Sequence, residues 1–204
     1  MTQSVATQIL SELNRLGRGH VFATSEFLHL GSRASVDKAL SRFTKAGKVR
    51  RLARGVYVYP ETNPLVGEVP PAPEAVAQAI ARSRGVTAQP SEAAAANALG
   101  LSTHVPARLV YLTNGTPSTY RIGNTEIRFK RAGPRRLAGA GTLSGTVLQA
   151  LRYLGPEGVS PTVVGRLRNQ LPRRERRRLG ELAPMTPAWM RPAVRQLATE
   201  QPDG

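Results

Sequence analysis

The spacing of the prolines is the feature that most constrains how this chain of 204 residues can fold. No proline precedes Pro60, and prolines then stand at positions 60, 64, 70, 71 and 73. Proline breaks the interior of a helix or a central strand, because its ring fixes φ and it has no N–H to donate. Residues 61–73 are therefore expected to be an extended, proline-rich linker. The sequence predicts one domain over residues 1–60, a second over residues 74–199 and a flexible tail at 200–204.

Charge is the second constraint, since 29 Lys and Arg residues stand against 13 Asp and Glu, a formal net charge of +16. A surplus of this size favours a polyanionic partner, because each phosphate that a cation neutralises releases condensed counterions. Nucleic acid is the first candidate and an anionic membrane surface the second; a basic protein that is simply well solvated is the third reading. Seven cations fall between Lys38 and Arg54.

The residue types also exclude several kinds of chemistry. The chain has no cysteine, so it has no disulfide, thiolate nucleophile or Cys-based metal site. Its histidines, His20, His29 and His104, lack metal-ligand spacing and are not accompanied by paired carboxylates. We therefore expect no enzyme activity, no metal and no cofactor.

Hydropathy predicts where the protein resides. No apolar run approaches the roughly 20 residues that cross a bilayer. The N-terminal residues also lack the basic and apolar segments of a signal peptide. We expect a cytoplasmic, nucleoid-associated protein with no membrane partner.

Residues 1–60 carry the pattern of a winged helix-turn-helix. Apolar residues at helical spacing predict a first helix over 4–16, and a short second helix follows at 26–30. Gly31 closes that helix and Ser32 caps a third helix over 33–46. This third helix has an apolar face and a cationic face, an arrangement typical of a DNA-recognition helix.

The run from Lys48 to Tyr59 is predicted to form two short strands joined at residues 53–55, a β-wing that carries arginines. A helix about 10–12 Å across fits the major groove, which is about 12 Å wide. Residues near the helix start would then face base edges, while later helix residues and the wing would meet phosphates or the minor groove. For any single residue, a merely solvated cation is the alternative. The candidate DNA-binding residues are Arg33, Ser35, Lys38, Arg42, Lys45, Arg50, Arg51 and Arg54.

Periodicity in residues 74–199 predicts an α+β domain with a small antiparallel sheet and a helical C-terminal half. Trp189 is expected to anchor its core. The predicted strands are 86–89, 108–113, 118–122 and 126–130, and the predicted helices include 74–84, 143–154, 160–171, 173–182 and 187–199.

A second group of cations lies beside the last predicted strand and in the arginine-rich run 173–178. It could contact nucleic acid or an acidic partner, and a solvated rim is an equal alternative. The residues of this possible second basic patch are Arg128, Lys130, Arg131, Arg135, Arg136, Arg173, Arg174 and Arg177.

Four stretches of the chain resemble a known family. Residues 32–43 (SRASVDKALSRF) and 47–57 (GKVRRLARGVY) resemble the N-terminal winged helix-turn-helix of the abortive-infection AbiEi antitoxins. Residues 87–101 and 108–113 resemble the start of that family's second domain. The resemblance implies a transcriptional autorepressor that binds inverted repeats in its own promoter DNA. It also implies a type IV toxin–antitoxin system, in which the second domain neutralises a nucleotidyltransferase-like toxin encoded beside it.

Two other functions remain open on sequence grounds. One is a transcription regulator whose C-terminal domain senses a small ligand or dimerises, with no toxin. The other is an RNA-binding or ribosome-associated basic protein. A toxin-like reading frame beside the gene would favour the antitoxin, and a preference for duplex DNA over structured RNA would exclude the RNA-binding protein.

Overall fold

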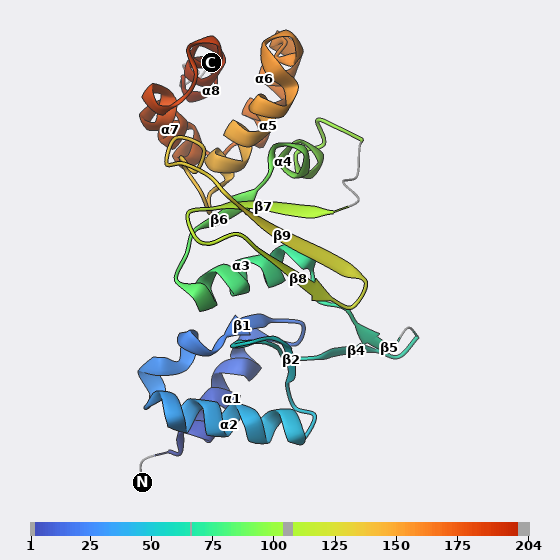
Figure 1. Cartoon of the computed structure of the whole chain (residues 1–204). Helices are drawn as coiled ribbons and strands as arrows, with labels where there is room; N and C mark the ends of the chain where they lie inside the picture. Colours follow the sequence, from blue (N-terminus) through green and yellow to red (C-terminus); the bar gives the residue numbers. More distant parts are fainter. Residues whose placement is uncertain (1–2, 66, 104–107, 200–204) are drawn as a thin grey trace. The chain divides into compact units, whose positions relative to one another are not determined.

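The computed structural model describes residues 3–65, 67–103 and 108–199, so His104 and the predicted tail at 200–204 lie outside the described residues. The chain divides into two compact units (Figure 1). The first comprises residues 1–86 with 120–125, and the second comprises residues 87–119 with 126–204. Both contain helices and strands, so the predicted α+β class is confirmed.

The first unit contains the predicted order of helix, short strand, short helix, long helix and hairpin, consistent with a winged helix-turn-helix. The short helix is a 3-10 helix, η1. The elements are α1 (Val5–Leu16), β1 (Val21–Ala23), η1 (Thr24–Leu30), α2 (Arg33–Lys45), β2 (Arg50–Ala53), β3 (Val56–Val58), β4 (Glu61–Asn63), β5 (Gly67–Val69) and α3 (Pro73–Arg84).

Serine caps set where the helices α1 and α2 of the first unit begin. Ser4 Oγ accepts the N–H of Thr7 at 3.2 Å at the start of α1. Ser32 Oγ accepts the N–H of Ser35 at 3.3 Å at the start of α2. Each bond satisfies an N–H that has no partner within the helix, and such a cap stabilises a helix by about 1 kcal/mol.

An aromatic cluster forms the centre of the first unit's core. The ring of Phe22 on β1 stacks on Tyr57 of β3, with 5.8 Å between centroids, and meets Phe27 edge-on at 5.2 Å. Val36 and Leu40 of α2 are fully buried in the same cluster. In the three-stranded sheet β1-β3-β2, α1 and α2 lie on one side and α3 on the other (Figure 1).

Residues 61–73 differ from the extended linker that the prolines predicted. β4 and β5 pair antiparallel, with Glu61 opposite Val69 and Asn63 opposite Gly67. The prolines flank these short strands instead of interrupting them, and Pro73 occupies the first turn of α3, where a missing N–H costs nothing.

The helix α3 belongs to the first unit, although the sequence placed it in the second. Arg82 Nε donates to Glu26 Oε1 at 2.9 Å, and Arg82 Nη2 donates to the carbonyl oxygen of Val21 at 3.3 Å. Five residues of α3 are buried. The helix therefore covers a sheet face that residues 1–60 alone would expose.

The second unit combines most of a four-stranded sheet, whose residues 120–125 are grouped with the first unit, with a set of helices. Its 3-10 turns are η2 (Ala183–Met185) and η3 (Ala188–Met190). The other elements are β6 (Ala88–Pro90), α4 (Glu92–Ala98), β7 (Leu109–Thr113), β8 (Ser118–Ile122), β9 (Thr125–Arg131), α5 (Leu143–Gly158), α6 (Pro161–Gln170), α7 (Arg173–Leu182) and α8 (Arg191–Ala198).

The sheet is mixed, which corrects the predicted antiparallel sheet. Its strand order is β6-β7-β9-β8, with β6 antiparallel to β7 and β7 parallel to β9. β8 lies at the edge, so the chain returns through the turn at 123–124 and places β9 beside β7 in the same direction. Alternating hydropathy identifies each strand but carries no information on which strand is its neighbour.

The helical half of the second unit has a core of its own, but Trp189 does not anchor it. Trp189 is 38% exposed, whereas the adjacent Met190 is fully buried. Successive residues of a tight 3-10 turn point to different sides, and here Met190 takes the inward side. The regular part of α5 ends at the predicted position, because Gly155 adopts a φ of +67° and Pro156 follows it.

A buried carboxylate joins α7 to the start of α5. Glu175 Oε2 accepts the N–H of Ser144 at 2.9 Å and its hydroxyl at 2.7 Å. Burial raises the pKa of Glu175, but the two bonds from Ser144 and the charges of Arg178 and Arg174 outweigh it, so the net pKa lies below its ordinary value. The negative charge also faces the positive end of the α5 dipole.

Glu175→Gln is expected to lower the free energy of unfolding by about 1–3 kcal/mol at neutral pH, since it removes charge-assisted hydrogen bonds. The lowered pKa means that the stabilisation is complete above the unfolded-state pKa and is lost as pH falls through the folded-state pKa. The difference from wild type should therefore shrink in acid. Urea unfolding followed by circular dichroism measures this. Glu181→Gln, on the same helix with a side chain 64% exposed, is the control, and an equal loss there would contradict the assignment.

Candidate nucleic-acid interface

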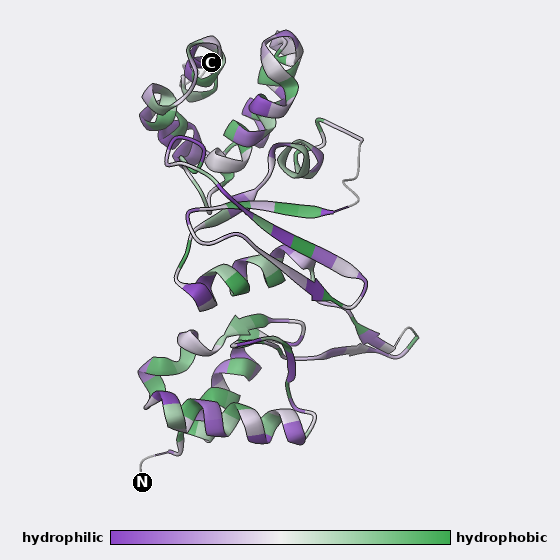
Figure 2. Ribbon diagram, viewed as in Figure 1, coloured by the Kyte–Doolittle hydropathy of each residue, from purple (hydrophilic) through white to green (hydrophobic). Residues whose placement is uncertain are grey.

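All eight predicted DNA-binding residues are exposed to solvent. On α2 the core takes Val36, Ala39 and Leu40, which lie on one side of the helix. The polar residues between them consequently face outward, and Figure 2 shows hydrophilic bands along α2. The helix therefore presents its cations to a partner and does not bury them.

Three of these cations form a stripe along the exposed side of α2. Lys38, Arg42 and Lys45 follow one another at spacings of four and three residues, which places them on one helical face. Within residues 3–65, 67–103 and 108–199, none of the three forms an ion pair. Their charge is therefore available to an external anion; we call them the α2 stripe.

Of the three predicted base-reading residues, Arg33, Ser35 and Lys38, the first two are already engaged within the helix. Arg33 Nε donates to Asp37 Oδ2 at 3.0 Å, an exposed pair four residues apart. The hydroxyls of Ser35 and Ser32 lie 2.9 Å apart in a hydrogen bond. Contact with a base would require both side chains to exchange these local partners. The sequence contained the signal for the first pair, an Arg and an Asp at positions i and i+4.

The wing arginines lie on the edge strand β2 and in the turn that follows. Arg50 is opposite Val58 and Arg51 is opposite Tyr57, and a bulge interrupts the ladder before Ala53. Arg50 Nη2 pairs with Glu68 Oε1 of β5 at 3.1 Å. This pair was not predictable while residues 61–73 were read as a linker.

The turn of the wing is held against the body of the first unit. Gly55 adopts a φ of +72°, which suits glycine, and its carbonyl oxygen accepts the N–H of Thr24 at 2.9 Å. A Cβ atom at Gly55 would lie 2.9 Å from Ser83 Oγ of α3. The wing is therefore short and rigid, with Arg54 exposed beside its anchored turn.

The possible second basic patch lies in the second unit, and at least four of its eight cations pair with carboxylates. Arg128 pairs with Glu126 at 3.6 Å, Arg174 with Glu175 at 3.9 Å, and Arg177 with Glu181 at 3.5 Å. Arg136 forms an ion pair with Glu92. The patch residues come from β9, the loop after it and α7, namely Arg128, Lys130, Arg131, Arg135, Arg136, Arg173, Arg174 and Arg177.

No group of three or more His, Asp or Glu side chains in the described part of the chain could hold a metal ion. No helix there is long and apolar enough to cross a membrane.

Comparison with known proteins places the chain in a family. Residues 8–179 match a family described as of unknown function, DUF6088. The chain belongs to the DUF6088 family. No curated protein and no solved structure matches it. The matched range runs from α1 into α7, so it includes most of both units of this DUF6088 protein.

If α2 binds duplex DNA, as the sequence predicts, Asp37→Asn should raise the affinity of this DUF6088 protein for it by about three- to tenfold, because the change frees Arg33 and removes a charge that repels phosphates. Fluorescence anisotropy with a labelled duplex measures the change. The matched control is Glu12→Gln on α1, which makes the same change in net charge away from α2. An equal gain in the control would assign the effect to net charge alone.

Proposed function

We propose that this protein is a transcriptional repressor that binds duplex DNA in its own promoter through α2 and the β2–β3 wing. The observation that carries the proposal is the α2 stripe. Its three exposed cations lie on one side of the second helix of a helix-turn-helix and have no carboxylate partner among the described residues. A helix face with uncompensated positive charge suits binding to the phosphate backbone of nucleic acid. Release of counterions from the phosphates supplies a large part of the affinity of such binding.

The dimensions of the stripe agree with a groove-bound helix. The eight residues from Lys38 to Lys45 span about 10 Å along the helix axis, close to the major-groove width of about 12 Å. The long Lys and Arg side chains would reach phosphates along the groove wall. Arg33 and Ser35, at the start of α2, would then lie nearest the base edges, with Arg33 exchanging Asp37 for a guanine.

The geometry favours DNA over RNA as the partner. The deep, narrow major groove of an A-form RNA helix does not admit an α-helix, whereas that of B-DNA does. Arg51 and Arg54 on the wing would add phosphate or minor-groove contacts. We infer repression by occlusion of the promoter, and the inverted repeats that the AbiEi resemblance implies would accommodate two copies.

Arg42→Gln and Lys38→Gln are each expected to weaken duplex binding about tenfold and to reduce the slope of log K against log salt by about 0.9, the value for one lost phosphate contact. The matched control is Arg15→Gln on α1, an exposed arginine away from α2. Band shifts over a range of salt concentrations measure both quantities. Equal effects of Arg15→Gln and Arg42→Gln, or tighter binding of structured RNA than of duplex, would contradict the proposal.

We extend the proposal to an antitoxin activity of the second unit, directed at a nucleotidyltransferase-like toxin. Its support is the resemblance of residues 87–101 and 108–113 to the second domain of AbiEi antitoxins. The second unit also has a separate hydrophobic core around Leu148, Leu167 and Leu179, which suits an activity of its own. A DNA-binding repressor without a toxin is the alternative.

Co-expression with the product of the neighbouring gene, each from an unrelated promoter, tests this activity. We expect the full chain to restore growth, and the double variant Lys38→Gln, Arg42→Gln to restore it equally, because repression is not needed there. Failure of the full chain to restore growth would contradict the antitoxin activity and leave the DNA-binding proposal intact.

A further inference from the structure

The second unit contains a cavity of about 340 Å³ that is rich in arginine. Arg135 and Arg136 come from the loop after β9, Arg152 from α5 and Arg191 from α8. The segment 184–188, which links the two 3-10 turns, supplies the remaining lining. Nothing in the proposed DNA-binding or antitoxin activity uses this cavity.

Arg152 is the least well satisfied arginine of the lining. Its Nε atom is out of reach of solvent and has no hydrogen-bond partner among the described residues, while Nη2 donates to the carbonyl oxygen of Arg135 at 3.3 Å. Burial and then the charge of Arg136 lower the pKa of Arg152. A half-buried guanidinium with an unsatisfied N–H is costly unless an anion compensates it.

The charges around the cavity are not balanced by the protein. Arg136 has Glu92 as its partner, whereas Arg135, Arg152 and Arg191 form no ion pair within the part of the chain that the structure describes. Arg191 Nε donates only to the carbonyl oxygen of Thr186, at 3.3 Å. Three guanidinium groups therefore converge without a carboxylate. Their planar N–H forks match the oxygens of phosphoryl groups.

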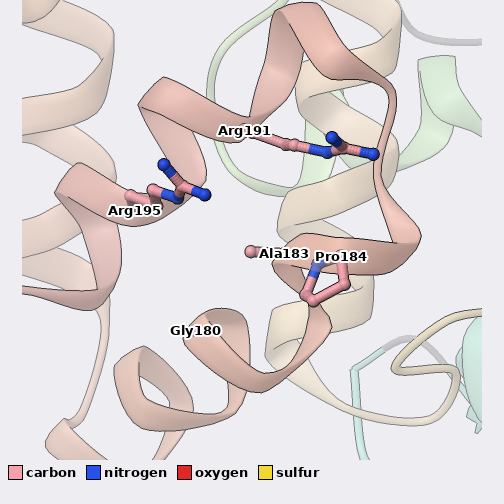
Figure 3. A pocket seen from close by; sticks show the side chains of 5 residues that line it. All are labelled: Gly180, Ala183, Pro184, Arg191 and Arg195. Atoms are coloured by element: carbon pink, nitrogen blue, oxygen red, sulfur yellow. The ribbon is translucent and has the colours of Figure 1, made fainter.

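The rest of the cavity lining suits the apolar part of a small organic ligand. Pro184, Met185 and Pro187 provide an apolar wall beside the arginines. Arg191 and Pro184 also line a second pocket of about 300 Å³, which Figure 3 shows with Arg191 and Arg195 reaching from α8 over Ala183 and Pro184. Pockets of this volume hold small molecules, and a polar end with an apolar wall fixes the orientation of the occupant.

We propose that this cavity binds a small organic diphosphate of nucleotide size. Arg135, Arg152 and Arg191 hold the two phosphoryl groups, whose charge of about −3 near pH 7 equals that of the three unpaired guanidinium groups. The apolar wall at Met185 and Pro187 receives the organic part. A stiff nucleic-acid duplex does not fit into a cavity of about 340 Å³. The proposal stands independently of the DNA-binding function.

Isothermal titration of the full chain with inorganic pyrophosphate and with ADP, at constant ionic strength, tests the site. We expect saturable binding of both, with ADP the tighter. Arg135→Gln and Arg191→Gln should each weaken binding about tenfold or more, the effect of losing a charged hydrogen bond. Arg135 is exposed, so its replacement should leave folding unchanged, as circular dichroism will verify.

The control is Arg177→Gln, which removes one arginine from the same unit at a side chain 86% exposed and outside the cavity; it should bind both probes normally. Three outcomes would overturn the proposal. They are the absence of saturable binding of either probe, an equal loss in the control, and binding of pyrophosphate without binding of ADP. Displacement of pyrophosphate by a short DNA duplex at lower concentration than by ADP would assign the site to nucleic acid and overturn it as well.

Discussion

The packing of one face of α2 is the constraint on which the rest of the first unit depends. Val36 and Leu40 are fully buried in the cluster that contains Phe22 and Tyr57, and this fixes the rotation of the helix about its own axis. Once that rotation is fixed, Lys38, Arg42 and Lys45 must lie outside, because a helix turns 100° per residue. The apolar residues thus determine where the charge is presented, and the aromatic sheet behind them gives the helix a rigid base.

The distribution of carboxylates decides which of the many cations are available for function. With 29 basic residues and 13 acidic ones, about half of the cations lack a possible partner. Asp37, Glu68 and Glu92 each occupy an arginine that sequence reasoning had counted as free. Among the cations of the described residues that form no ion pair, two groups differ in character. The α2 stripe is open and linear, which suits a polyanion such as nucleic acid. The arginines around Arg152 line a cavity, which suits a small anion.

Much of the first unit could be predicted from local pattern, because its signals are local. Serine at residues 4 and 32, glycine at residue 31 and the apolar spacing between them placed α1 and α2 to within about one residue. The same reasoning placed the exposed side of the candidate interface correctly. It failed for residues 61–73, because prolines that flank two short strands also fit a linker. It failed as well for α3, which is attached to the first unit in part by the contact of Arg82 with Glu26, 56 residues away in the chain. Contacts between residues so far apart in the chain produce no periodic pattern in the sequence.

By itself the sequence determined the long helices, most strands other than β4 and β5, the outward side of α2 and the excess of positive charge. Each of these follows from residues within a few positions of one another. Only the tertiary structure decided the strand order of the mixed sheet, the burial of Met190 in place of Trp189, and the convergence of Arg135, Arg152 and Arg191 on one cavity. These features join segments that lie far apart in the chain. Their geometry follows from how the elements pack, and packing is a property of surfaces in contact that no single stretch of sequence contains.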